Sequence, residues 1–257
     1  MSRYRNPATG QVVALVAVIH VGELPYYREL QRELDRYDLV LFEMVGTAEE
    51  REKARSGEVE SRLLFIAELQ QELQQLLELD HQLDNIDYQR PNFRHADLSQ
   101  RSFQRELRAR GSSLIPFEAL MRLAAPLLKA SLALTSSLRS IDPQLTNRLR
   151  WQSAKMMADT ERLLNRLGIR DQENPDDLII GVRNTHAWKI LQRSLPEGFR
   201  RTAIFYGAAH MPDFQRRLRE TGWILEERSW YPAWRVPVPS DEEASPPPRR
   251  FPPEANL

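Results

Sequence analysis

Two histidines follow apolar segments of similar design, "ALVAVIHVGELPYY" (14–27) and "TAIFYGAAHMPDF" (202–214). His20 and His210 each have a small residue three positions earlier, and each is soon followed by a proline that suits the first turn of a helix. Glu43 closes a third apolar run, "DLVLFE" (38–43). Two imidazoles and a carboxylate are a reasonable ligand set for zinc, manganese, cobalt or iron. A carboxylate beside such an ion can instead be the general base that deprotonates a metal-bound water.

Three further polar residues are candidates to join these side chains. Asp97, in "RHADLS", either adds a metal ligand or caps a helix that begins near Ser99. Arg183 either binds substrate or orients Glu43, and its alternative role is a surface ion pair of small worth. Asn184 is predicted to be the N-cap of the helix "THAWKILQRSL". The other histidines lack a strand-end position, so we expect solvated or structural roles for His81, His95 and His186.

Alternating strands and helices position these candidates. Apolar, β-branched runs predict buried strands at 12–19, 38–43, 177–182 and 202–206, with a final strand in "WILEERSW" (223–230). Helices between them predict βαβ units, and hence an α/β fold with a mostly parallel sheet. The two ends of the chain resemble each other, which indicates two similar βαβ halves.

The candidate residues fall at equivalent places in these units. His20, Glu43 and Arg183 each come at the carboxyl end of a predicted strand, and His210 lies just past one. Ligands bind at that edge of an open parallel sheet, so we expect His20, Glu43 and His210 to share one pocket. In the second half, Glu226 occupies the position that corresponds to Glu43.

A long, mostly helical insertion of about 47–170 separates the two halves. Amphipathic patterns predict helices at 61–83 and 149–168, whose Leu and Met stripes pack against the sheet or against a second copy in a homodimer. The segment 84–99 is polar and aromatic without clear periodicity. We expect its part "YQRPNFRHADLS" (88–99) to fold over the pocket and to contribute Asp97 or an aromatic wall. The single α/β domain then covers 10–234, and a proline-rich, disordered tail covers 235–257.

Composition excludes several classes of function. Lys plus Arg and Asp plus Glu both number 36, so a net charge of zero gives no general attraction to nucleic acid. With no cysteine, disulfides, thiolate nucleophiles and Cys-ligated metals are excluded, and any metal site uses His, Asp and Glu. Neither a secretory signal nor a membrane span is predicted, so we expect a cytoplasmic protein with no membrane partner.

The order of these motifs resembles the TraB/PrgY/GumN family, which belongs with the Tiki, ChaN-like and erythromycin-esterase-like proteins. The resemblance rests on "AVIHVGE", "DLVLFEMV", "IDYQRPNFRHADLS", "VRNTHAW" and "FYGAAHMPDF", and it covers roughly residues 10–234. It implies that His20 and His210 are the two motif histidines, that Glu43 is the strand-end glutamate, and that Arg183 with Asn184 is the Arg-Asn pair. Tiki members are regarded as metal-dependent proteases, TraB and PrgY as pheromone-shutdown proteins, and erythromycin esterases as hydrolases without an obvious metal.

The chain departs from the family pattern at two positions. Ala17 stands where glycine is usual, and Val182 stands where many relatives have a glutamate. If that glutamate belongs to the site, this chain has one carboxylate fewer for a metal.

Together these patterns lead to a metal-dependent hydrolase, peptidase-like or esterase-like, that acts on a peptide or small molecule. His20, His210 and Asp97 are its expected ligands for manganese, cobalt or zinc. Glu43 is the expected base, and Arg183 and Asn184 complete the catalytic group. The alternative is a non-enzymatic, TraB-like regulatory or sequestering protein that binds a peptide or small ligand in the same pocket.

Overall fold

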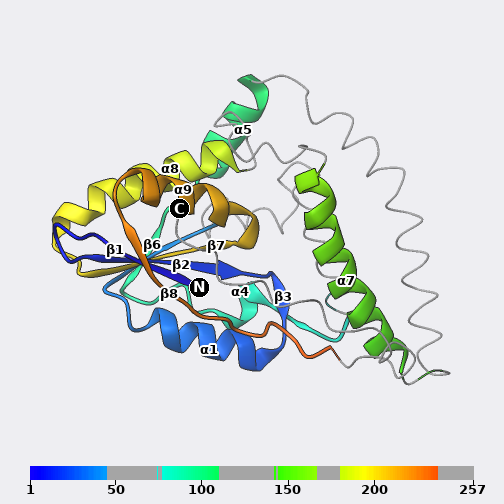
Figure 1. Cartoon of the computed structure of the whole chain (residues 1–257). Coiled ribbons are helices and arrows are strands. Elements are labelled where there is room, and N and C mark those ends of the chain that lie inside the picture. The colour runs from blue at the N-terminus through cyan, green and yellow to red at the C-terminus, as the bar shows by residue number, and fades with distance from the viewer. Residues whose placement is uncertain (45–73, 75–76, 110–141, 143, 167–179, 237–257) are drawn as a thin grey trace.

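A computed structural model describes residues 1–44, 74, 77–109, 142, 144–166 and 180–236 (Figure 1). Most of the predicted insertion and residues 237–257 of the predicted tail lie outside this part. The strands are β1 (Ser2–Arg5), β2 (Val12–Val18), β3 (Val21–Gly22), β4 (Leu39–Phe42), β5 (Asp80–His81), β6 (Phe93–His95), β7 (Arg201–Gly207) and β8 (Ile224–Arg228). The helices are α1 (Leu24–Leu34), α4 (Gln82–Asn85), α5 (Gln100–Ala109), α7 (Leu145–Arg166), α8 (Gly181–Ser194) and α9 (Met211–Glu220), with 3-10 turns η2 (Leu195–Glu197) and η3 (Ala208–His210).

The main sheet has six strands in the order β6-β4-β7-β2-β1-β8. β6, β4, β7 and β2 are parallel neighbours, whereas β1 is antiparallel to both β2 and β8. The predicted α/β class with a mostly parallel sheet is therefore confirmed. The register pairs Phe42 with both His95 and Phe205, and Val18 with Gly207, so the carboxyl ends of the four parallel strands meet at one edge.

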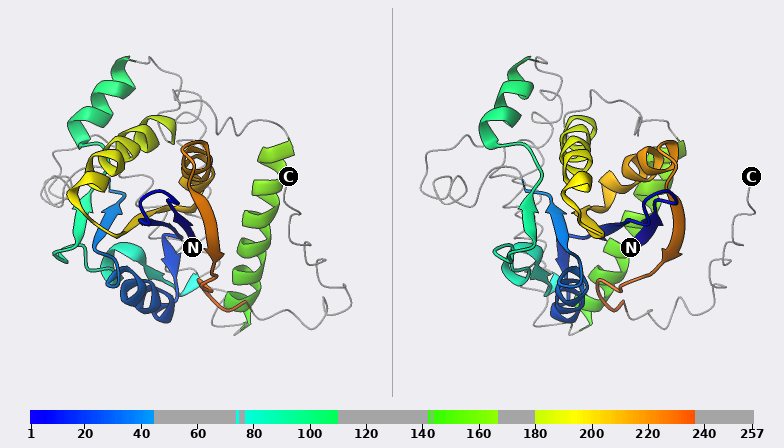
Figure 2. Two further views of the ribbon diagram at one scale, coloured as in Figure 1. Left: turned by 60° about the vertical axis from the view of Figure 1, so that its left-hand side comes forward. Right: turned by 90° about the vertical axis from the view of Figure 1, so that its left-hand side faces the viewer.

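Helices cover both faces of the sheet, and the views in Figures 1 and 2 agree that α1 lies on one side and α8 with α9 on the other. Successive residues of β2 alternate between the two faces: Val13 and Leu15 pack with α8 and α9, whereas Ala14 and Val16 pack with α1. Burial on both faces explains why these strands read as continuous apolar runs. Because β2 and β4 are apolar along their whole length, the polar side chains come after their ends.

The structure differs from the sequence prediction in the second half of the chain. Gly181 and Val182 begin helix α8 and do not belong to a strand, and 177–179 lie outside the described residues. A short apolar run fits a buried strand and a buried helix equally well, which is the reason for this error. β8 pairs with β1 at the far edge of the sheet, where Glu226 binds Arg5, so Glu226 does not correspond to Glu43 in the site.

The described residues of the predicted insertion form strands as well as helices. α7 matches the helix predicted at 149–168, but residues 80–81 form β5, and 93–95 form β6 of the main sheet. β6 extends the sheet beside β4, where a strand had not been expected. Tyr88 and Phe93 pack around Phe42 on the α1 side of the sheet.

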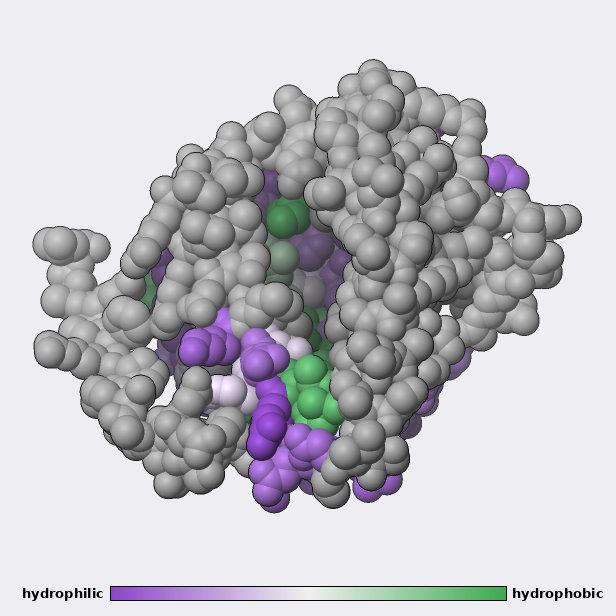
Figure 3. All heavy atoms as spheres, turned by 90° about the vertical axis from the view of Figure 1, so that its right-hand side faces the viewer, coloured by the Kyte–Doolittle hydropathy of each residue, from purple (hydrophilic) through white to green (hydrophobic). Residues whose placement is uncertain are grey.

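No helix in the described ranges is long and apolar enough to cross a membrane. The space-filling view from the α7 side shows described residues of mixed hydropathy, hydrophobic next to hydrophilic (Figure 3).

Candidate functional site

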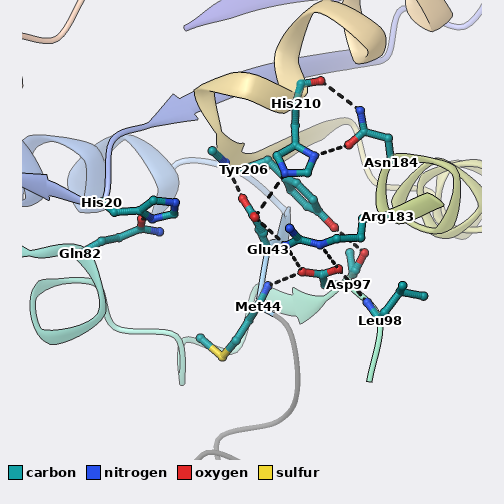
Figure 4. A network of polar contacts seen from close by, with 12 residues as sticks. His20, Glu43, Met44, Gln82, Asp97, Leu98, Arg183, Asn184, Tyr206 and His210 are labelled. Carbon is teal, nitrogen blue, oxygen red and sulfur yellow. Dashed lines mark hydrogen bonds and ion pairs between the residues drawn. The ribbon is translucent and has the colours of Figure 1, made fainter. Parts of the chain in front are cut away.

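Glu43 stands at the centre of a polar network at the carboxyl edge of the sheet (Figure 4). Arg183 Nη2 donates to Glu43 Oε1 at 2.5 Å, and the main-chain N–H of Gly207 donates to Oε2 at 2.5 Å. His210 Nε2 lies 3.4 Å from Oε1. The register of β4 beside β7 produces this arrangement, because it brings the end of β4 next to Gly207.

The electrostatics of the network keep Glu43 ionised. Burial acts to raise the pKa of its carboxyl, but the hydrogen bond from His210 and the charge of Arg183 outweigh this effect, so the pKa lies well below its ordinary value. A carboxylate with so low a pKa is a weak proton acceptor near neutral pH. Glu43 is therefore better suited to hold its neighbours than to act as the expected base.

Asp97 and Arg183 form the buried base of the network. Arg183 binds Asp97 through two hydrogen bonds, Nε to Oδ1 at 2.9 Å and Nη2 to Oδ2 at 2.5 Å. Asp97 also accepts from the main-chain N–H groups of Met44, at 3.0 Å, and Leu98, at 2.7 Å. Burial opposes the charge of Arg183, yet Asp97 and Glu43 raise the pKa of its guanidinium above the ordinary value.

Asp97 does not cap the helix that follows it. Helix α5 begins at Gln100, and the hydroxyl of Ser99 accepts from the N–H of Ser102 at 3.2 Å. The predicted segment 84–99 thus delivers Asp97 to Arg183.

His210 is held from both sides of its ring. Its Nδ1 lies 2.6 Å from Asn184 Oδ1, and Asn184 Nδ2 in turn donates to Asp213 and to the carbonyl of His210. Since Nε2 faces Glu43, both ring nitrogens face side-chain oxygens, which fixes the orientation of the ring. Asn184 lies inside α8, so the prediction that it is an N-cap was wrong, although the residue does reach the site.

His20 approaches the network from the other side, and its side chain is exposed (Figure 4). Its Nδ1 lies 2.9 Å from Gln82 Oε1. Within the part of the chain that the structure describes, Nε2 of His20 has no hydrogen-bond partner. Of the two site histidines, His20 is thus the one with an uncommitted nitrogen.

Gly207 is the point at which the three predicted side chains meet. The position that a Cβ on Gly207 would take lies 3.2 Å from Glu43 Oε2, 3.7 Å from His20 Nε2 and 3.8 Å from His210 Cδ2. The missing side chain therefore leaves a space bordered by all three groups. Sequence reasoning predicted this convergence on one edge from the strand-end positions.

The donor set does not fit the expected divalent ion. Both oxygens of Asp97 are saturated by hydrogen bonds, and both oxygens of Glu43 are already bound, one of them by the Arg183 cation. A metal at Glu43 would face that positive charge. Among the described residues, no group of three or more His, Asp or Glu side chains is placed to hold an ion.

Several residues around the site were missed by sequence reasoning. Gln82 orients His20 directly. Asp213 orients His210 indirectly, because it accepts a hydrogen bond from Asn184. The ring of Tyr206 packs edge-on against His210 with 5.2 Å between centroids, and its hydroxyl donates to Ala96 O at 2.6 Å. "GAAH" did mark Gly207 as a small residue, but nothing in the sequence signals the other three.

Of the remaining histidines, His95 ends β6 at the same edge of the sheet, so the expectation that it lacks a strand-end position was wrong. His81 caps α4 by accepting from the N–H of Leu83, and His95 Nε2 lies 2.6 Å from the carbonyl of Met44. Burial lowers the pKa of His186 on α8.

In comparisons with known proteins, no family model, no curated protein and no solved structure matches the chain.

The low pKa of Glu43 predicts a stability effect in acid. Because folding lowers this pKa, ionised Glu43 contributes stability above the ordinary carboxyl value of 4.5, and that contribution is lost as the pH falls below it. We expect the difference in unfolding free energy between wild type and Glu43→Gln to shrink between about pH 6 and pH 3. Urea unfolding at several pH values measures this difference.

Glu226→Gln is the control, because it removes one negative charge at an exposed ion pair far from the site. A difference between wild type and Glu43→Gln that stays constant over the same pH range contradicts the assigned charge of Glu43.

Proposed function

We propose that this protein is a hydrolase that activates water in the space bordered by His20, Glu43 and His210, and that it cleaves an ester or amide bond of a peptide or small molecule. The observation that carries this proposal is the exposed His20, whose Nε2 has no hydrogen-bond partner among the described residues. The same space at Gly207 is bordered by a second imidazole, that of His210, whose two ring nitrogens are both held. A general base must be accessible and uncommitted, and His20 meets both conditions.

His20 is the base. With Nδ1–H donating to Gln82 Oε1, the lone pair of the neutral ring lies on Nε2, which takes a proton from water. The hydroxide oxygen bonds to the substrate carbonyl carbon, and the carbonyl π electrons move to its oxygen. When the tetrahedral intermediate collapses, the bond to the leaving alcohol or amine breaks, and the proton from His20 passes to the leaving group.

His210 stabilises the charge that develops on the carbonyl oxygen. Its ring is fixed by Asn184 at Nδ1 and lies against Glu43, so it need not reorganise during the reaction. Glu43 is a positioning residue that joins His210, Arg183 and the Gly207 main chain. Arg183 keeps Glu43 ionised, and Asp97 keeps Arg183 in place.

The resemblance to the TraB/PrgY/GumN family supports a hydrolase or ligand site at these residues. Within that resemblance, the erythromycin-esterase-like members are the better parallel, because they are regarded as working without an obvious metal. We propose that the architecture belonging to this function has two similar βαβ halves and a helical insertion between them, and that a homodimer forms through the insertion.

A panel of chromogenic esters and peptide anilides tests the proposal. Wild-type protein is assayed with chelator and, separately, with added manganese, cobalt or zinc. We expect turnover in chelator. Turnover that requires one of these metals overturns the base role of His20. Binding of panel compounds without turnover favours the regulatory or sequestering alternative.

Substituting Gly207 tests the shared space directly. Gly207 has φ −52° and ψ 145°, a conformation open to alanine, so Gly207→Ala adds a methyl group without backbone strain. That methyl would lie among the three side chains, 3.2 Å from Glu43 Oε2. We expect turnover to fall by about 100-fold, at a cost of about 1–2 kcal/mol in unfolding free energy.

Ala208→Ser is the matched control, because it adds one atom at the next residue, which is exposed. Equal activity of Gly207→Ala and wild type would show that the reaction does not use this space.

A further inference from the structure

Gln82 binds His20 at two places. Its side-chain Oε1 lies 2.9 Å from His20 Nδ1, and its main-chain N–H donates to the carbonyl of His20 at 2.9 Å. At the other end of the amide, Gln82 Nε2 donates to Tyr88 Oη at 2.8 Å. Gln82 itself is buried, with 4% of its surface exposed, which is unusual for a glutamine.

The backbone around this pair is held in register. Val21 pairs with His81 and Gly22 with Asp80 in the β3–β5 ribbon, so the chain on either side of the His20–Gln82 contact is fixed. On the α1 side, Tyr27 Oη donates to the carbonyl of Ile19 at 3.0 Å. Gln82 therefore meets His20 in one defined geometry.

We infer that Gln82 is a positioning residue that selects the tautomer of His20. The hydrogen bond from Gln82 Nε2 to Tyr88 turns Oε1 toward His20, and an oxygen at that place accepts only from a protonated Nδ1. The proton is thereby kept on Nδ1 and the lone pair on Nε2, on the side of Gly207. Free histidine in water favours the opposite tautomer, with the proton on Nε2. The hydrogen bond to Gln82 must therefore reverse this preference.

This inference rests on the proposed function, because the tautomer matters for catalysis only if His20 is the base. It also parallels the other imidazole, since Asn184 Oδ1 holds Nδ1 of His210 in the same way. The two amides thus fix which atoms of the rings face the site: Nε2 of His20 and Cδ2 of His210 border the space at Gly207, and Nε2 of His210 faces Glu43. Asn184 was singled out from the sequence, whereas Gln82 was not.

Nitrogen-15 NMR of the full-length wild-type protein tests the tautomer without any substrate. His20 is assigned as the ring signals that disappear in His20→Asn, and the spectra are recorded at a pH at which the ring is neutral. We expect Nδ1 of His20 to carry the proton in wild type, and the Nε2–H form to appear in Gln82→Met. A neutral wild-type His20 protonated on Nε2, or a Gln82→Met spectrum equal to wild type, overturns the inference.

Kinetics then separate positioning from folding. Gln82→Met keeps the length of the side chain but removes the acceptor, so kcat should fall by about 10-fold with little change in KM. Gln82→Glu restores an acceptor for Nδ1–H and should recover part of kcat. Asn85→Ala is the matched control on α4, since it removes a side-chain hydrogen bond to the His81 carbonyl and should leave kcat unchanged.

The two kinds of measurement distinguish two failures. If the wild type has the expected tautomer but no turnover on any substrate, the proposed function fails and the role of Gln82 in orienting His20 stands. If turnover is present and the Gln82→Met tautomer is unchanged, the role of Gln82 fails and the proposed function stands.

Discussion

Replacing His20 by asparagine is expected to reduce turnover by about 100- to 10,000-fold, the usual contribution of a general base. The unfolding free energy should stay within about 0.5 kcal/mol of wild type, because the His20 side chain is exposed. Asparagine is the suitable replacement, since its Nδ2 can donate to Gln82 Oε1 as His20 Nδ1 does. The variant therefore removes the base and preserves the contact that organises the segment.

His81→Asn is the matched control for His20→Asn. His81 is also at the β3–β5 ribbon, and its side chain caps α4, a role that asparagine fills well. Steady-state kcat and KM are measured for wild type and both variants on the best substrate of the panel. Turnover that survives in His20→Asn but not in His210→Ala would assign the base to the other imidazole.

The strand-end positions were sufficient to predict that His20, Glu43 and His210 meet. In a parallel sheet the carboxyl ends of neighbouring strands share one edge, so an apolar run that stops at a polar residue already places that residue. β2, β4 and β7 are such runs and lie next to one another, with β7 in the middle. This prediction requires only that the strands are buried on both faces, and their continuous apolar runs indicate this.

The roles of the same residues could not be predicted, because they depend on contacts between distant parts of the chain. Glu43 looked like a base as long as its partners were unknown. In the structure, Arg183, the Gly207 main chain and His210 surround Glu43, and these contacts make it a stable anion. From its sequence position Asp97 is similarly a candidate metal ligand, but in the structure four hydrogen bonds occupy its carboxylate.

Short or antiparallel elements were the other source of error. β3 and β5 are two residues each, too short for any periodicity, so Gln82 could not be connected with His20. β1 and β8 pair antiparallel on the side of the sheet away from β4 and β7. Glu226 on β8 therefore does not take part in the site, although its sequence position resembles that of Glu43. The helical start of α8 at Gly181 was mistaken for the end of a strand because the apolar run before it is short.

Arg183→Met is expected to lower the unfolding free energy by about 3–5 kcal/mol, the largest stability effect of any substitution considered. Arg183 and Asp97 have side chains that are 9% and 0% exposed, and Arg183 is the cation that binds both oxygens of Asp97. Removing Arg183 leaves a buried carboxylate whose donors, within the described part of the chain, are two main-chain N–H groups. It also deprives Glu43 of the neighbouring positive charge.

Arg94→Met is the matched control for this substitution. Arg94 also binds a carboxylate through two nitrogens, at 2.8 and 2.9 Å from Glu197, but their side chains are 40% and 43% exposed. Water replaces the exposed Glu197, but Arg94 Nη1 also donates to the buried Ser194 hydroxyl at 2.9 Å, so we expect a loss of about 1–2 kcal/mol, below that of Arg183→Met. Urea unfolding at neutral pH measures both variants.

The double variant Arg183→Met with Asp97→Asn identifies the cause of the loss. If the cost of Arg183→Met is an uncompensated buried charge, neutralising Asp97 should recover part of it, because an asparagine side chain needs no counter-ion. Asparagine Oδ1 can still accept from one of the two main-chain N–H groups that Asp97 binds. A double variant less stable than Arg183→Met alone would show that the loss arises from packing around the arginine and not from charge.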